Sequence, residues 1–308
     1  MRVEVTSKPF SAVEADLHAI GLLEGDELPA ELRGASGAGD VKPRFEKLTL
    51  LRPERPRRLL VVGLGKREDL ESERLRVAAA LAVTEAGRHE ARSIAWDVPD
   101  PGTGPPPGAR AAALVEGTVL ASYRFDRFKS RDPDDPPPPV LERLALAAGD
   151  DADAAAGPAE AARARAEAAN RARELQSLPS NVVTPSYLAD RAREIAEASE
   201  AVSVEVLGRA EIEERGMGGL AAVARGTAEE PALIALRYGG GDGEGETLGL
   251  VGKAVTFDSG GLSIKPPASM PSEKGDMSGG AAVIAAMGAL AELGVPVRCL
   301  AVVAAAEN

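Results

Sequence analysis

The sequence is poor in cysteine, histidine and aromatic residues, and each shortage excludes a class of protein. A single cysteine, Cys299, excludes an internal disulfide framework, and the apolar run around it favours a buried thiol without a catalytic role. The two histidines, His18 and His89, lie far in sequence from the stretch richest in reactive side chains, which argues against a zinc centre built on histidine. Aromatic residues make up 3% of the chain, so alanine, valine and leucine must fill its cores.

Basic residues are outnumbered by acidic ones, 36 lysines and arginines against 48 aspartates and glutamates. The formal net charge is −12, which argues against a general partnership with nucleic acid or with a membrane surface. The first residues, MRVEVTSKPF, have neither the pattern of a signal peptide nor the apolar length of a transmembrane helix. We therefore expect a cytoplasmic protein with no membrane partner. A length of 308 residues, 44% of them hydrophobic, predicts about two domains with substantial cores.

The two parts of the chain both alternate strand-like and helix-like segments, which favours α/β folding. A helix is expected from Leu70 to Gly87, and an exposed, alanine-rich linking helix from Pro158 to Leu175. The loop Gly63 to Lys66 lacks the third glycine of a dinucleotide fingerprint and the spacing of a P-loop, so no nucleotide cofactor site is predicted. Two proline-rich stretches, residues 99–107 and 132–139, are expected to be exposed connections.

In the last third of the chain the expected elements follow in regular order, and parallel strand pairing is predicted. Thr184 and Pro185 form a typical helix start, with the threonine as cap and the proline at the first helical position. The expected helices are Tyr187 to Ser199, a short one from Arg209 to Arg215, and Gly279 to Leu293. The expected strands are Val202 to Leu207, Ala232 to Tyr238, Thr247 to Val251 and Val297 to Ala304.

The densest chemistry lies between Leu248 and Gly280, in LGLVGKAVTFDSGGLSIKPPASMPSEKGDMSGG. An apolar run ends there at polar residues and a helix-like run follows, which places the polar residues at the carboxyl end of a strand, where open α/β sheets hold their ligands. The candidate site residues are Lys253, Asp258, Lys265 and Asp276. Aspartate oxygens and close-lying backbone suit a divalent cation, and a lysine can join only when its amine is neutral.

The residue types alone leave alternatives open. Lys253 and Asp258 would face opposite sides of a regular strand, so their convergence on one ion requires a bend at or after Gly252. The same residues also fit surface ion pairs on a loop. Asp276 stands where an aspartate commonly caps a helix, although Ser278 can take that role instead.

The runs VGKAVTFDSGGLSIK and KGDMSGGAAV resemble the catalytic core of the leucyl aminopeptidase (cytosol aminopeptidase) family of dinuclear metallo-aminopeptidases. Supporting similarity occurs in LVVGLGKRED, LVEGTVLASYRFDRFKS, LPSNVVTPSYLADRA and the terminal VVAAAEN. The resemblance implies a macro-like α/β domain in residues 1–150 and a linking helix in residues 151–178. It further implies that residues 179–308 form the first part of a three-layer α/β aminopeptidase domain.

The resemblance also implies residue roles. Lys253 and Asp276 would ligate one of two divalent metal ions, Mn²⁺ or Zn²⁺, and Asp258 would bridge both. Lys265 would stay off the metals as an electrophile that polarises the scissile carbonyl while metal-activated hydroxide attacks it. The implied activity is the release of N-terminal residues of the leucine type from peptide substrates, and the implied assembly is a homo-hexamer.

The sequence departs from the family pattern in lacking a later Asn-Thr-Asp-Ala-Glu-Gly-Arg motif. In the family its acids complete the metal shell and its arginine holds a bicarbonate, so bicarbonate is expected only where that motif is supplied. We therefore expect half of a metal centre in an incomplete catalytic domain. Glu307 follows the last predicted strand, but the family pattern assigns it to a structural turn. The activity of the chain by itself stays open, with a non-catalytic fragment or a binding and assembly module of the first domain as alternatives.

A second departure concerns the pocket for the first side chain of the substrate. The family usually has a methionine three residues before the second aspartate, where this sequence has Glu273. One hypothesis is a pocket that favours a basic first residue, because a desolvated carboxylate attracts a cation. In the other, Met270 fills the pocket and Glu273 faces water.

Overall fold

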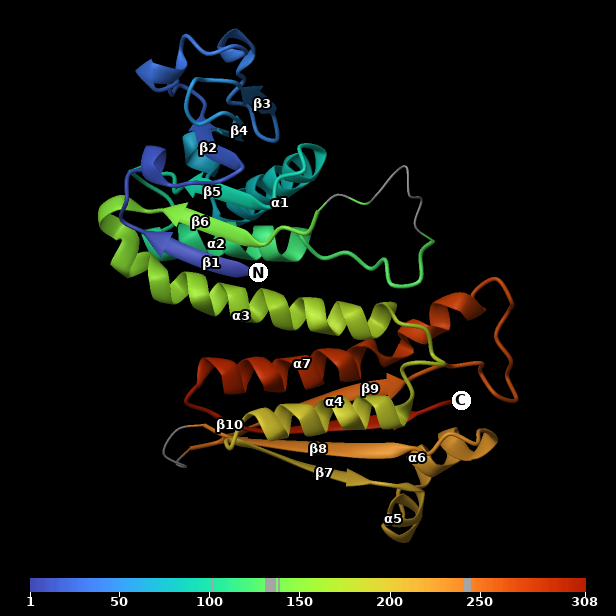
Figure 1. Cartoon of the computed structure of the whole chain (residues 1–308). Coiled ribbons are helices and arrows are strands. Elements are labelled where there is room, and N and C mark those ends of the chain that lie inside the picture. The colour runs from blue at the N-terminus through green and yellow to red at the C-terminus, as the bar shows by residue number, and fades with distance from the viewer. Residues whose placement is uncertain (101, 131–136, 138, 241–244) are drawn as a thin grey trace. The chain divides into compact units, whose positions relative to one another are not determined.

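The computed structural model describes residues 1–100, 102–130, 137, 139–240 and 245–308. The chain forms two compact units, Met1–Ala166 and Glu167–Asn308, and each unit has its own β-sheet (Figure 1). Both sheets are accompanied by helices, which confirms the predicted α/β class. Most of the proline-rich stretch 132–139, and residue 101 in the other one, lie outside the described residues.

The first unit is built on a six-stranded sheet in the order β1-β6-β5-β2-β4-β3. Neighbouring strands are parallel, except that β3 runs antiparallel to β4. The glycines of the Gly63–Lys66 segment lie within β4 itself, up to Gly65. The strands are β1 (Arg2–Thr6), β2 (Leu17–Leu23), β3 (Leu48–Leu51), β4 (Leu59–Gly65), β5 (Ser93–Asp97) and β6 (Arg143–Ala147), and the main helices are α1 (Ser72–Arg88) and α2 (Pro107–Ala121).

The core of this unit compensates for its few aromatic residues with small aliphatic ones. Leu75 of α1 and Leu114 of α2 are fully buried in one cluster with Trp96 of β5, and alanines of both helices fill the space between them. Because alanine adds so little bulk, the helix axes can approach each other and the sheet closely. Leucine and alanine therefore replace the large rings that the composition lacks.

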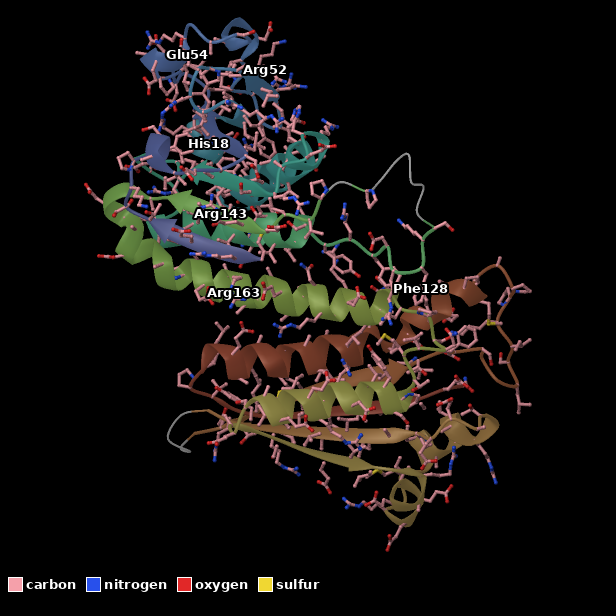
Figure 2. The ribbon with its side chains drawn as sticks, in the orientation of Figure 1. His18, Arg52, Glu54, Phe128, Arg143 and Arg163 are labelled. Carbon is pink, nitrogen blue, oxygen red and sulfur yellow. The ribbon has the colours of Figure 1, made fainter. Side chains whose placement is uncertain are left out.

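His18 is a buried titratable group in the first unit (Figure 2). Its Nε2 lies 2.7 Å from the carbonyl oxygen of Val13, and its ring meets Phe10 edge to face at 5.2 Å. Burial lowers the pKa of this imidazole below 6.5, against the opposing effect of the Val13 hydrogen bond. The folded state therefore disfavours the protonated ring, whereas the unfolded chain takes up the proton near pH 6.5.

We expect the stability of the first unit to be greatest above pH 6.5 and to fall as the pH is lowered. One such group can contribute a slope of at most about 1.4 kcal/mol per pH unit between its unfolded and folded pKa. Urea unfolding followed by the fluorescence of Trp96, the one tryptophan of the chain, measures this at pH 7 and pH 5. His18→Leu should remove this component, and an unchanged pH dependence in that variant would contradict the assignment.

The long helix α3 (Ala152–Ser177) follows β6, and the division between the two units falls inside it. The prediction that this helix is exposed is wrong. Ala155, Ala159 and Ala162 belong to the core of the first unit, and Ala168 packs with Ala285 and its neighbours in the second. The absence of large apolar groups suggested exposure, but small residues are what a closely packed helix needs.

The second unit has a four-stranded sheet in the order β7-β8-β10-β9. Helices α4 and α7 lie on one face of this sheet (Figure 1). Strand β9 forms one edge of the described sheet, and its Leu248 and Val251 side chains are exposed. The elements are α4 (Pro185–Ala198), β7 (Val202–Leu207), α5 (Arg209–Glu214), α6 (Gly218–Val223), β8 (Ala232–Gly239), β9 (Thr247–Val255), α7 (Ser278–Leu293) and β10 (Arg298–Ala306).

The strand pairing of the second unit corrects the prediction of a parallel arrangement. β9 and β10 are parallel, as expected for strands joined through α7, but β8 runs antiparallel to both β7 and β10. Helices α5 and α6 lie beyond one end of the sheet instead of crossing its face, so the chain returns antiparallel (Figure 1). The connection from β8 to β9 is likewise too short for a crossover.

The helix boundaries of the second unit follow local chemistry. The Thr184 hydroxyl accepts a hydrogen bond from the backbone N–H of Tyr187 at 3.2 Å, so the predicted cap of α4 is confirmed. Gly294 ends α7 in the left-handed conformation at φ 58°, which glycine adopts without strain.

The segment Met270–Leu293 is long and apolar enough to meet a length-and-composition criterion for crossing a membrane. Its first part is a short 3₁₀ helix that carries Glu273, Lys274 and Asp276, and its second part is α7. Ile284 and Met287 of α7 are buried, as in the core helix of an α/β unit. The segment is therefore weak evidence for a membrane span.

Candidate metal centre

The candidate site lies where β9 and β10 end side by side. The backbone N–H of Asn308 donates to the Phe257 carbonyl at 2.9 Å, and that of Ser259 donates to the Asn308 carbonyl at 2.8 Å. These two bonds extend the pairing of the strands past their ends. β9 itself ends at Val255, which leaves Asp258 just past the carboxyl end of the strand.

The start of α7 brings a second acidic residue to the same place. Gly252 of β9 lies so close to the helix that a Cβ atom there would stand 2.7 Å from the Gly280 Cα. Gly279 and Gly280 are thus part of the helix and of its contact with the strand, not of a tight turn. Asp276 lies just before α7, in the 3₁₀ helix η7 (Met270–Met277).

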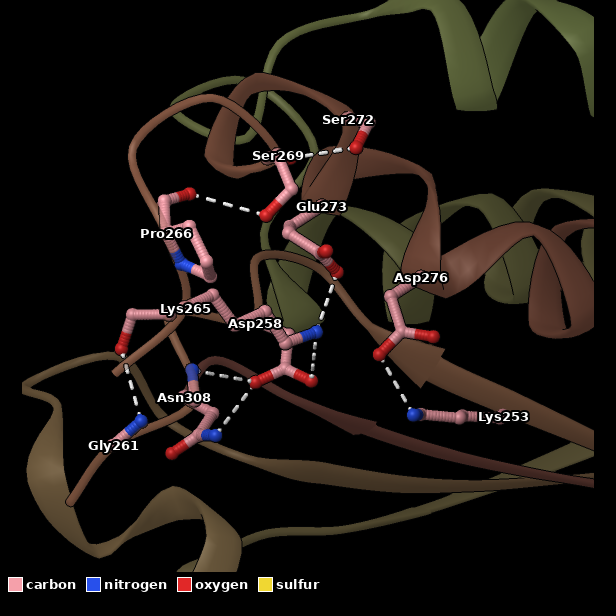
Figure 3. Close-up of polar contacts among 12 residues, drawn as sticks. Lys253, Asp258, Gly261, Lys265, Pro266, Ser269, Ser272, Glu273, Asp276 and Asn308 are labelled. Atoms are coloured by element: carbon pink, nitrogen blue, oxygen red, sulfur yellow. Dashed lines mark hydrogen bonds and ion pairs between the residues drawn. The ribbon is translucent and has the colours of Figure 1, made fainter. Parts of the chain in front are cut away.

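Asp258 is held by three hydrogen-bond donors (Figure 3). Its Oδ2 pairs with the Lys265 Nζ at 2.9 Å, and its Oδ1 accepts from the Asn308 Nδ2 at 2.8 Å and from the Gly260 N–H at 2.9 Å. Gly260 has a φ of +88°, a left-handed conformation that glycine adopts without strain. The Lys265 hydrogen bond, helped by the other two donors, lowers the pKa of Asp258 to about 2.

The two lysines take different partners. Lys265 Nζ contacts the Glu273 Oε2 at 2.6 Å as well as Asp258, and these two carboxylates raise its pKa. Lys253 Nζ pairs with the Asp276 Oδ2 at 2.7 Å. The Lys253 side chain remains 61% exposed, whereas the Asp276 side chain is 26% exposed. Each aspartate therefore has its own lysine in this structure.

Three carboxylates converge at the site. One oxygen from each of Asp258, Glu273 and Asp276 lies within 4.8 Å of the others, and all three residues are half-buried. Oxygen donors at this spacing fit a divalent cation such as Mn²⁺, which prefers carboxylate and water ligands. The Lys253 amine is close enough to Asp276 to join as a nitrogen ligand once it has lost its proton. The donor set thus fits a metal ion.

Other predicted residues have different surroundings. Met270 lines an open hollow of about 470 Å³ with Phe257, Pro267 and Pro271. Glu307 accepts a hydrogen bond from the Thr227 hydroxyl at 2.6 Å and is not part of the three-carboxylate group. Asp276 does not cap α7, because the residue at the cap position is Met277 and makes no side-chain bond to the helix.

Comparison with known families adds independent information. Residues 170–308 match the catalytic domain of the cytosol aminopeptidase family, and residues 29–132 match the N-terminal domain of the same family. The chain belongs to the cytosol aminopeptidase family. Its second unit is thus the first part of the catalytic domain, and its first unit contains the N-terminal domain of the family.

Individual relatives show how much of a longer protein this chain matches. A probable cytosol aminopeptidase of Roseiflexus castenholzii is 40% identical over the whole chain, which spans 63% of that relative. The bottromycin maturation enzyme BotP, solved in complex with Mn, is 35% identical with a TM-score of 0.81 over 96% of the chain and 60% of BotP. A mutant of tomato leucine aminopeptidase is 28% identical with a TM-score of 0.81, over 99% of the chain and 62% of the tomato protein. The chain therefore spans less than two thirds of the length of these relatives.

Two residues at or near this candidate site were missed in the sequence. Asn308 donates to the Asp258 carboxylate directly, and Phe257, which precedes Asp258 in the sequence, lines an apolar hollow. The sequence did contain a signal for Asn308. Asn308 follows a buried strand, and that strand was expected to lie beside the strand that precedes Asp258. The carboxyl ends of parallel neighbours meet at one edge of a sheet, which would have placed the two residues together.

Proposed function

We propose that the protein acts as a metal-dependent aminopeptidase that releases N-terminal residues from peptides. The observation that carries this proposal is the convergence of Asp258, Glu273 and Asp276 with two lysines at the carboxyl end of β9. Membership of the cytosol aminopeptidase family and similarity to a Mn complex support it. Because the chain spans less than two thirds of its relatives, the activity of the whole protein is part of the proposal.

In this proposal Asp258, Asp276 and the neutral amine of Lys253 hold divalent metal, two ions of Mn²⁺ or Zn²⁺ in the complete centre. A bound divalent ion supplies Lewis acidity and lowers the pKa of coordinated water. Lys265 supplies a fixed positive charge beside the site, and its Nζ is positioned to hydrogen-bond the carbonyl oxygen of a peptide as negative charge develops there. Asp258 keeps its charge at neutral pH, since its pKa is about 2.

The apolar hollow gives the proposal a substrate preference. An apolar surface suited to a leucine-like first side chain is formed by Met270 and by Phe257, the residue before Asp258, together with Pro267 and Pro271. Glu273 already pairs with Lys265 at 2.6 Å, so a basic first residue would have to compete with an internal ammonium. The preference for a basic residue stays an untested prediction, and comparing lysyl with leucyl substrates before and after Glu273→Met tests it.

Release of leucine from a leucyl anilide, with and without Mn²⁺, tests the proposed activity. From the complete protein we expect release that depends on Mn²⁺, that stops with a chelator and that is lost in Asp258→Asn. Release that persists in Asp258→Asn would contradict the proposal. Metal binding without any release would leave these residues as a metal-holding portion that requires further acids and the arginine with its bicarbonate.

The proposal also covers the location, the binding partners and the oligomeric state of the protein. We propose a cytoplasmic location, peptides as partners, neither nucleic acid nor membrane as a partner, and a homo-hexamer, as the family resemblance implies. On the same basis we propose that the first unit is a macro-like domain. Light scattering of the purified chain measures the assembly, and a monomer at micromolar concentration would contradict the hexamer for this chain.

A further inference from the structure

Glu273 departs from the methionine usual in the family, and the structure gives it a specific partner. Its Oε2 lies 2.6 Å from the Lys265 Nζ, on the other side of which stands the Asp258 Oδ2 at 2.9 Å (Figure 3). The Glu273 side chain is 18% exposed and the Lys265 side chain is 29% exposed. One ammonium group is thus held between two carboxylates in a partly desolvated place.

The helix that carries Glu273 is itself anchored. Glu273 lies in η7, where the next residue, Lys274, donates from its Nζ to the Ser177 carbonyl at 2.5 Å. The Ser272 hydroxyl donates to the carbonyl of Ser269, the residue just before this helix, at 2.6 Å. The backbone that carries Glu273 is therefore tied at neighbouring residues independently of Lys265.

Asp258 cannot serve Lys265 and a metal ion equally. A divalent cation that takes the Asp258 oxygens withdraws one of the two partners of Lys265 and also repels its ammonium by like charge. With a methionine at position 273, no carboxylate on this side would hold the ammonium in place. The proposed function assigns the metal to Asp258, Asp276 and Lys253, and under that assignment Glu273 keeps its contact with Lys265 when the cation binds.

We infer that Glu273 is a positioning residue, which retains the Lys265 ammonium beside the site when a divalent cation binds Asp258. This inference rests on the proposed function, because it assigns Lys265 to the substrate carbonyl and Asp258 to the metal. The raised pKa of Lys265, which arises first from its Glu273 hydrogen bond, agrees with it. Glu273 thereby acts on the reaction through Lys265 and does not itself contact the substrate.

The experiment follows the lysine ammonium groups of the full chain by NMR, with ¹⁵N at the lysine Nζ and diamagnetic Zn²⁺ as the probe. Lys265→Arg assigns the signal. Wild-type Lys265 should show slow proton exchange with water both before and after Zn²⁺ is added. In Glu273→Gln its exchange should be roughly tenfold faster without metal, since a charge-assisted hydrogen bond is lost, and its signal should disappear with Zn²⁺.

Two further variants and one internal reporter complete the test. Glu273→Asp keeps the carboxylate and should restore part of the protection of Lys265. Glu205→Gln removes the same charge from β7, at the opposite edge of the sheet, and should change nothing at Lys265. The Lys253 signal reports metal binding, because Lys253 pairs with Asp276 and not with Glu273.

The possible outcomes separate this inference from the proposed function. If Zn²⁺ moves the Lys253 signal but Lys265 behaves alike in wild type and Glu273→Gln, the inference is overturned while the metal site stands. The same holds if Lys265 loses its signal with Zn²⁺ in the wild type. If Zn²⁺ leaves Lys253 unchanged in the wild type, the metal site itself fails, and the inference fails with it.

Discussion

Asp258→Asn is expected to lower the affinity of the chain for Mn²⁺ by at least about 100-fold, since loss of a mere supporting partner of a metal ligand already costs up to that much. Asp258 is the residue around which the site is assembled, with Lys265, Asn308 and Gly260 bound to its two oxygens. An amide keeps the shape of the side chain but removes the negative charge that a divalent ion requires. Isothermal titration of Mn²⁺ into the purified variant measures the change.

Asp190→Asn is the matched control for this substitution. Asp190 lies on α4, pairs with Arg193 at 2.7 Å and takes no part in the three-carboxylate group. The Asp190→Asn substitution removes the same charge from the same unit. It should leave the affinity for Mn²⁺ within about twofold of the wild-type value, because an exposed charge is screened by water and salt. Equal losses in the two variants would show that Mn²⁺ responds only to net charge.

Gly252→Val is expected to destabilise the second unit by about 3 kcal/mol, because a Cβ there has no room. It would stand 2.7 Å from the Gly280 Cα, 2.8 Å from the Gly279 carbonyl oxygen and 2.9 Å from the Gly280 nitrogen. All three are backbone atoms, so no side chain can rotate to relieve the overlap. The strand and α7 must separate, which also moves Asp276 away from Lys253.

Gly249→Val is the control for this effect within the same strand. Nothing lies within 4 Å of a Cβ at Gly249, so the change should stay within about 0.5 kcal/mol. Urea unfolding followed by circular dichroism measures both variants, while Trp96 fluorescence reports the first unit, which neither should affect. A Gly252→Val transition as stable as that of Gly249→Val would contradict the close packing of β9 on α7.

The place of the site could be read from the sequence because the signal is local. A strand that stops at polar residues and a helix that follows them put Asp258 and Asp276 at one end of the sheet, whatever the rest of the fold does. The sequence could not, however, predict which lysine pairs with which carboxylate at the site. Which lysine meets which carboxylate depends on how the loop after Val255 turns, and that loop is held by Asn308, 50 residues away in sequence.

The topology shows the same division between local and distant causes. The cap at Thr184 and the end of α7 at Gly294 are local and were predicted correctly. The antiparallel course of β8 was missed, because it depends on α5 and α6 lying at the end of the sheet instead of on its face. The alanines of α3 were misread as a sign of exposure, because a single sequence does not show which neighbour a small residue will meet.

The central claim is that Asp258 and Asp276 hold a divalent metal ion. Crystals of the chain soaked in Mn²⁺ and measured near the manganese absorption edge test it most directly, since anomalous scattering locates the ion without prior assumptions. The account predicts a strong anomalous peak within coordination distance of an oxygen of each aspartate, with Lys265 still beside Glu273. No peak at this position, while manganese appears only at exposed acidic side chains elsewhere, would contradict it.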